Sequence, residues 1–184
     1  YWCGWFDHWG EEHHRTGAKE AADGVEWMIS RGISFNLYMA HGGSSFGFMS
    51  GANFSRVYEP DILAYDYDSP LDEAGRITPK FTAIRNVISK YLTPEEKLPE
   101  PDNTVKTISV SDIKFTETAS LNDLLGKPVK SEQPMKVEDL KQSLGLTLYR
   151  TSLPGSAKTG TLHIDDVRDF ASVSVKGISQ GYLD

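Results

Sequence analysis

The amino-acid sequence predicts an α/β fold built from parallel strands and helices, followed by an antiparallel β domain. In the first part, helical periodicity alternates with a buried strand. In the second part, short β-forming segments lie between Gly, Pro and Asp turns. We therefore divide the chain into an α/β part at 1–93, a linker at 94–104 and the start of a β-sandwich domain at 105–184.

A helix is expected from Gly17 to about Ser30, because its apolar residues recur at steps of three and four. Thr16 is expected to cap this helix, and Gly32 to end it. The following segment, 33–40 (ISFNLYMA), is short, apolar and rich in β-branched and aromatic residues, which predicts a parallel strand buried on both faces. The residues of the expected helix face are Ala18, Ala21, Ala22, Val25, Met28 and Ile29.

A long polar, glycine-rich stretch then leads to a second amphipathic helix, whose apolar positions are Phe81, Ile84, Val87, Ile88 and Tyr91. Such an alternation of strands and helices is typical of a parallel sheet or barrel.

The chain changes character at 93–104 (TPEEKLPEPDNT), where three prolines lie among charged residues, as in an interdomain linker. Beyond this linker, β-forming residues predict strands at 107–115, 144–153, 160–166 and 170–178. Their spacing favours an antiparallel sandwich.

Composition excludes several functional classes. The net charge of −7 argues against a nucleic-acid partner, and no apolar run approaches the roughly 18 residues of a membrane span. Cys3 is the single cysteine, so neither an internal disulfide nor a thiolate metal site is expected. His13 and His14 stand beside Glu11 and Glu12, but HExxH is absent and adjacent side chains should diverge, so we expect no metal. No cofactor is expected either.

Aromatic residues are concentrated at the start of the chain, where Trp2, Trp5, Phe6 and Trp9 are interleaved with Asp7 and His8. Core packing explains these tryptophans as well as a ligand site does. The functional interpretation is a platform for a sugar, since one face of a pyranose ring consists of C–H groups that stack on aromatic planes.

A second cluster is Tyr65-Asp66-Tyr67-Asp68. If this segment is extended, both tyrosines point to one side and both aspartates to the other. The tyrosines would then face a ligand. The alternative is a structural turn, because Asp and the following Ser69-Pro70 are turn formers.

The glycine-rich 41–47 (HGGSSFG) has neither the GxGxxG spacing nor the lysine of a phosphate-binding loop. We interpret it as a loop at the C-terminal end of a barrel strand, the face at which barrel active sites are built.

Together, GWFDHWG, SFNLYMAHGGSSFG, GAN, YDYDSPLDEAG and the Thr-Pro-Lys-Phe helix resemble, in order and spacing, the closing part of the catalytic barrel of glycoside hydrolase family 35 β-galactosidases. The later LYRTSLP and VSVKGISQGYLD resemble the β domain that follows it. The resemblance implies the final βα units of a (β/α)8 TIM barrel, followed by part of an antiparallel β-sandwich. It also implies an extracytoplasmic protein: secreted, periplasmic or lysosomal.

The resemblance implies a retaining β-galactosidase that hydrolyses terminal β-linked galactose with two glutamates. In the family pattern the nucleophile directly precedes the position of Tyr1 and the acid/base lies on an earlier strand, so both are expected outside this chain. Carried over by position, the aromatic residues of the galactose pocket are Trp2, Trp5, Tyr38, Tyr65 and Tyr67. The expected partners are a β-galactoside and the remainder of the barrel.

Two residues depart from the family pattern: Ser44 stands where Thr is more usual, and Ser69 where Ala is more usual. Both are expected at the rim of the pocket. Two rival interpretations remain, a noncatalytic galactoside-binding module and a purely structural segment. A Glu directly before Tyr1, together with an Asn-Glu pair at the end of an earlier strand, would decide for the enzyme.

Overall fold

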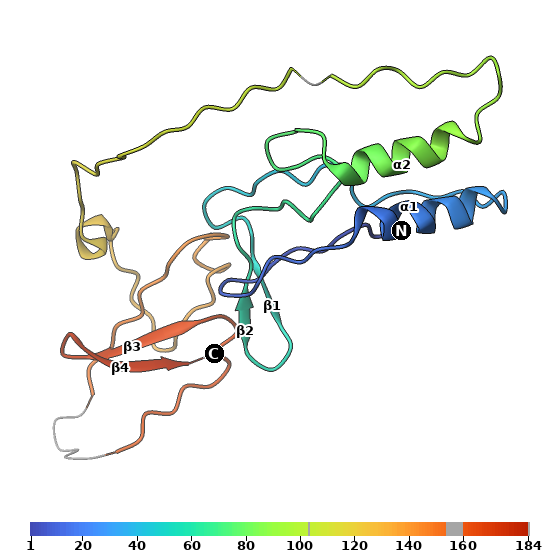
Figure 1. The fold of residues 1–184 in the computed structure, drawn as a ribbon. Coiled ribbons are helices and arrows are strands. Elements are labelled where there is room, and N and C mark those ends of the chain that lie inside the picture. The colour runs from blue at the N-terminus through green and yellow to red at the C-terminus, as the bar shows by residue number, and fades with distance from the viewer. Residues whose placement is uncertain (103, 154–159, 184) are drawn as a thin grey trace. The chain divides into compact units, whose positions relative to one another are not determined.

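The computed structural model describes residues 1–102, 104–153 and 160–183. It divides into two compact units, Tyr1–Lys106 with Ile164–Asp184, and Thr107–His163. Each unit is described by itself. Figure 1 shows the order of the elements along the chain, with helices α1 and α2 in the first unit.

Helix α1 (Ala18–Ile29) forms where the apolar periodicity predicts it. The prediction that Thr16 caps this helix is wrong, because the N-cap is Gly17, which has no side chain to offer. The backbone N–H of Thr16 donates instead to Asp68 Oδ2 at 2.6 Å. Gly32 ends the helical turn as predicted: its φ is +67°, and its N–H donates to the carbonyl of Ile29 at 2.9 Å.

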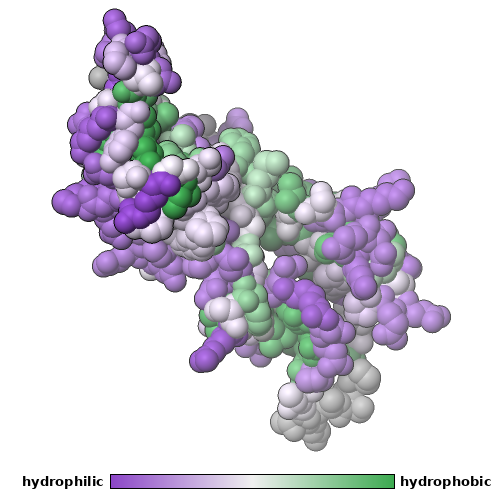
Figure 2. Space-filling model, turned by 90° about the vertical axis from the view of Figure 1, so that its right-hand side faces the viewer, coloured by the Kyte–Doolittle hydropathy of each residue, from purple (hydrophilic) through white to green (hydrophobic). Residues whose placement is uncertain are grey.

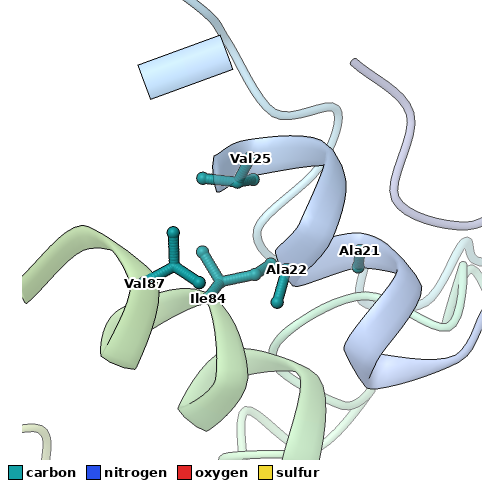
Figure 3. Packing of buried hydrophobic residues seen from close by; sticks show 5 residues of the cluster. All are labelled: Ala21, Ala22, Val25, Ile84 and Val87. Carbon is teal, nitrogen blue, oxygen red and sulfur yellow. The ribbon is translucent and has the colours of Figure 1, made fainter. Parts of the chain in front are cut away.

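Helix α2 (Pro79–Ser89) begins with proline in its first turn, and the Thr78 hydroxyl accepts the N–H of Phe81. The hydrophobic core lies between this helix and α1, and Figure 3 shows its side chains meeting across the interface. Each buried Val or Ile here contributes about 1.5–3 kcal/mol. The core residues are Ala21, Ala22, Val25, Ile84 and Val87.

Two antiparallel hairpins complete the first unit. Strands β1 (Ala52–Phe54) and β2 (Tyr58–Pro60) pair with Asn53 opposite Glu59. Strands β3 (Ala171–Val175) and β4 (Ile178–Leu183) are joined by Lys176 and Gly177, both with positive φ, as a tight hairpin requires. The strand predicted at 170–178 thus corresponds to β3, but the chain turns back before Ile178.

The parallel strand predicted at 33–40 is not a regular strand. The segment makes a single parallel bridge, from Tyr38 to Trp2, where Tyr38 N–H donates to Tyr1 O at 2.9 Å. A strand becomes regular only where successive residues are paired, and here its neighbour is the short segment 1–3. The βα units of a barrel therefore stay a prediction.

Strands are also absent from the described parts of the ranges 107–115, 144–153 and 160–166, contrary to prediction. The second unit contains the short 3₁₀ helix η1 (Leu121–Leu124) and local contacts such as Tyr149 Oη to the carbonyl of Met135 at 2.7 Å. β-forming side chains alone do not make a sheet, because a strand needs a neighbour to accept and donate its backbone hydrogen bonds.

Outside the helix pair, large apolar side chains remain exposed, among them Phe46, Ile108 and Phe115. Figure 2 shows hydrophobic patches between hydrophilic ones on one face. Exposed apolar surface of this kind marks places where other protein surface or a ligand binds. Among the described residues, no helix has the length and hydrophobicity needed to cross a bilayer.

Candidate active site

Three segments distant in sequence converge in the first unit: residues 1–9, 38–44 and 61–68. The first two are joined by the bridge between Trp2 and Tyr38. Residues 61–68 join both, through the N–H of Ile62 to Asp7 O at 3.2 Å and the N–H of Tyr65 to Gly43 O at 2.8 Å. All five aromatic residues predicted for the pocket are carried by these segments.

Two glycines allow this close approach. A Cβ atom at Gly4 would lie 1.7 Å from the carbonyl oxygen of Tyr67, and one at Gly42 would lie 1.7 Å from that of Tyr65. Neither position has room for a side chain, so residues 65–67 lie directly against both neighbouring segments.

The five predicted aromatic residues form one cluster of ring contacts. The centroid distances are 6.4 Å from Trp2 to Trp5, 6.2 Å from Trp5 to Tyr67, 5.5 Å from Tyr38 to Tyr67 and 5.5 Å from Tyr65 to Tyr67. Trp2, Trp5 and Tyr38 are exposed, whereas Tyr67 is only 2% exposed and lies at the back of the cluster. The structure therefore brings together the residues predicted from sequence, with an open aromatic side.

Two tyrosines of the cluster, Tyr65 and Tyr67, are harder to deprotonate than a free tyrosine. Burial and a hydrogen bond with Tyr38 raise the pKa of Tyr65 to about 12. Burial, with Tyr38 nearby, also raises the pKa of Tyr67 above its ordinary value. Both side chains thus keep their hydroxyl protons, and with them the ability to donate hydrogen bonds, at any physiological pH.

The assumption that residues 65–68 are extended is wrong at Tyr67 and Asp68, whose φ angles are +61° and +48°. The chain turns here because Asp66 fastens the turn: its carboxylate accepts the N–H groups of Asp68 at 3.0 Å and Glu73 at 3.2 Å. The tyrosine rings nonetheless lie together, while Asp66 and Asp68 bind other partners. The structural-turn interpretation is thus confirmed at Tyr67 and Asp68, whereas the prediction that the tyrosines face a ligand stays a prediction.

Asp7 anchors the aromatic segment through two histidines. One carboxylate oxygen contacts His13 Nδ1 at 2.5 Å, and the other contacts both the N–H and Nδ1 of His14, each at 2.8 Å. Burial alone would raise the pKa of Asp7, but these hydrogen bonds hold it below its ordinary value. The expectation that the adjacent histidines diverge is wrong, because their loop brings both rings to one carboxylate.

One group with metal-ligand chemistry was not foreseen from sequence: ligand atoms of His13, Asp66 and Asp68 lie within 4.8 Å of one another. Their polar atoms already have protein partners. His13 Nε2 contacts Asp66 Oδ1 at 3.2 Å and its Nδ1 contacts Asp7, while Asp68 Oδ2 accepts from Lys80 at 2.7 Å. We interpret the group as hydrogen bonds and ion pairs that connect loops, rather than as a metal site.

Of the two serines expected at the rim of the pocket, Ser44 and Ser69, one lies elsewhere. Ser44 is exposed and donates to Glu73 Oε1. Ser69, expected at the rim, is buried, and its Oγ lies 2.6 Å from the carbonyl oxygen of Leu71. Ser69 therefore belongs to the Asp66 turn.

Two residues of the site were not among the five predicted for the pocket. Phe6 stacks between Trp5 and Tyr65, with centroids 5.3 and 6.3 Å away, although its place among the tryptophans was a signal. Lys80 belongs to the Thr-Pro-Lys-Phe motif, but its burial was not predicted, because a lysine in the first turn of an amphipathic helix is usually exposed. Trp9, by contrast, lies open to solvent, with no ring contact to the cluster among the described residues.

Comparison with known proteins gives family matches and relatives for nearly the whole chain. Residues 1–91 match the model of glycosyl hydrolases family 35, and residues 134–184 match the first all-beta domain of beta-galactosidase. The chain is 44% identical over 180 residues to a beta-galactosidase of Xanthomonas manihotis, covering 95% of this chain. It is 38% identical over 195 residues to a beta-galactosidase of Felis catus, covering 100% of this chain. It is also 38% identical over 189 residues to beta-galactosidase 17 of Arabidopsis thaliana, covering 98% of this chain. The chain spans 27 to 29% of the length of these curated relatives.

Proposed function

Because the chain belongs to glycosyl hydrolase family 35 and continues into the all-beta domain, we propose that the full-length protein is a retaining β-galactosidase that removes terminal β-linked galactose from glycans. The observation that carries this proposal is the aromatic cluster, open on one side and closed behind by Tyr67.

Such a cluster suits galactose chemically. The C–H face of the pyranose ring stacks on an exposed indole such as Trp5, and this contact removes apolar surface from water. Neutral tyrosine hydroxyls at the same site donate hydrogen bonds to ring hydroxyls, which fixes the orientation of the sugar. The proposed substrate-binding residues are Trp2, Trp5, Tyr38, Tyr65 and Tyr67.

We propose that both catalytic glutamates come from parts of the protein that precede Tyr1, with the nucleophile immediately before it. In retaining enzymes these two carboxyl groups lie about 5–5.5 Å apart. Two observations support the proposal. Tyr1 and Trp2 run alongside Asn36 and Tyr38 at the cluster, so a residue before Tyr1 would lie next to the sugar. Three carboxylates of the segments that carry the cluster, those of Asp7, Asp66 and Asp68, already bind other groups of the protein.

The division at 1–93, 94–104 and 105–184 is likewise part of the proposal, with the first part completing a (β/α)8 barrel supplied by the remainder of the protein. The two family matches, over 1–91 and 134–184, support it. So does the exposed apolar surface, which further barrel strands and helices would cover.

The test compares the full-length protein with the isolated 184-residue chain. We expect the full-length protein to hydrolyse a nitrophenyl β-galactoside with retention, and the isolated 184-residue chain to be inactive. Addition of an upstream fragment ending in the nucleophilic Glu should restore hydrolysis if the two fragments associate.

Two results would contradict the proposal. Hydrolysis by the isolated chain that is lost on Asp66→Asn would place the catalytic residues within this chain. Galactose binding by the full-length protein without hydrolysis would favour a noncatalytic binding module.

A further inference from the structure

Lys80 is buried at a position where lysine is usually exposed. It is the second residue of α2 and is only 4% exposed. Lys90, which directly follows the same helix, has a side chain that is 58% exposed and pairs with Glu26 at 3.1 Å. Burying an ammonium group costs free energy unless its charge is paired and its hydrogens are bonded. The groups that bind the buried ammonium of Lys80 therefore indicate what its burial does for the site.

All three hydrogens of the ammonium group have acceptors. Nζ donates to the carbonyl of Cys3 at 2.5 Å, to Asp68 Oδ2 at 2.7 Å and to the carbonyl of Asp68. Cys3 lies between Trp2 and Trp5, and Asp68 directly follows Tyr67. One side chain thus joins the two segments that carry most of the aromatic cluster.

The turn that Lys80 holds is unfavourable on its own. Tyr67 and Asp68 are consecutive non-glycine residues with φ of +61° and +48°, a conformation that persists only where surrounding contacts impose it. This turn places the Tyr67 ring 6.2 Å from Trp5 and 5.5 Å from Tyr38. If the turn relaxed, Tyr67 would leave the back of the cluster.

We propose that Lys80 is a positioning residue of the galactose site: it binds the Cys3 and Asp68 carbonyls, holds the turn at Tyr67 against the Cys3–Trp5 segment, and acts on the sugar only through Tyr67. This inference rests on the proposed function.

The test uses the full-length protein with Lys80→Met, which keeps an unbranched side chain as far as Cε and removes the ammonium group. Since misplacement by about 1 Å can cost about 100-fold, we expect kcat/KM on a nitrophenyl β-galactoside to fall by about 10- to 100-fold. Lys90→Met is the matched control, and it should leave kcat/KM within about twofold, as for an exposed ion pair. Equal kinetics for both variants would overturn the proposal.

A second variant separates positioning from stability, because Lys80→Met leaves the Asp68 carboxylate without its cation. Lys80→Met/Asp68→Asn removes both charges, so its melting temperature should recover towards wild type, whereas kcat/KM should stay low because the two carbonyls still lack their donor. Recovery of kcat/KM along with the melting temperature would show that Lys80 serves stability alone.

Coupling to Tyr67 is tested with a double-mutant cycle. If Lys80 acts through Tyr67, Lys80→Met combined with Tyr67→Phe should lower kcat/KM hardly more than the worse single change. Independent, multiplying effects would overturn the proposal.

Hydrogen exchange separates this inference from the proposed function. Amides of residues 65–68 should exchange faster in Lys80→Met than in Lys90→Met. If the full-length protein hydrolysed no β-galactoside, the proposed function would fail, and the exchange comparison would still decide the role of Lys80. Unchanged exchange there would overturn that role.

Discussion

Replacing Trp5 by alanine in the full-length protein should lower kcat/KM by about 70-fold. Trp5 is 43% exposed within the cluster, so a bound sugar has about 100 Å² of its roughly 250 Å² surface to cover. At about 25 cal/mol per Å² this contact amounts to about 2.5 kcal/mol, and each 1.36 kcal/mol corresponds to a factor of ten. The assay is steady-state hydrolysis of a nitrophenyl β-galactoside.

Trp27 supplies a matched control, because it is 55% exposed on α1 and its ring contacts the guanidinium of Arg31, 4.5 Å away. Trp27→Ala should leave kcat/KM near wild type. A Trp5→Ala protein that folds and keeps full efficiency would show that Trp5 packs within the protein and does not bind the sugar.

Three further changes probe other parts of the site. Tyr67→Phe, which deletes a hydroxyl and keeps the ring, should reduce kcat more than it reduces the melting temperature; a lower melting temperature with unchanged kinetics would make Tyr67 structural. Gly4→Ala should lower the free energy of unfolding in urea by about 2–4 kcal/mol, because its Cβ would overlap the Tyr67 carbonyl; a neutral change would refute that contact. Asp7 has a lowered folded pKa, so its stabilisation is present above its unfolded pKa and is lost as pH falls through the folded value. Between about pH 6 and about pH 3, Asp7→Asn should therefore start less stable and lose less stability than wild type; parallel curves would contradict this.

Local patterns predicted the helices well. The three- and four-residue spacing of apolar residues is a property of each segment alone, so Val25 and Ile84 were placed on the correct faces. The glycine stop at Gly32, just past the end of α1 at Ile29, was predictable for the same reason. Thr16 was wrongly predicted as the N-cap because the helix begins one residue later than expected, with Gly17 as its N-cap. The residue at which a helix begins depends on tertiary contacts and cannot be fixed to one position from sequence.

The strands were predicted less well because a strand is defined by its neighbours. Residues 33–40 and 107–115 have strand-forming composition, yet ladders of hydrogen bonds require a partner of matching length. Of the four strand ranges predicted beyond the linker, 170–178 is the one where the described residues form a strand, and its partner β4 follows directly in sequence after Lys176 and Gly177. The residues of the aromatic cluster were predictable from family resemblance. The hydrogen bonds and ion pairs of His13 and Lys80 were not predictable, because they form only where segments distant in sequence meet.

These hydrogen bonds and ion pairs explain how an open aromatic surface keeps a defined geometry. Exposed rings do not by themselves hold one another in place, because contacts between them are weaker than hydrogen bonds to charged groups. In this chain each aromatic segment is fixed from behind: residues 1–9 through Asp7 and the Cys3 carbonyl, and residues 65–68 through Asp66 and Asp68. Buried charged ties add little net stability over apolar packing, but they are costly to break one partner at a time. We therefore expect changes behind the cluster to alter the placement of the sugar, and changes on its open face to alter the strength of its binding.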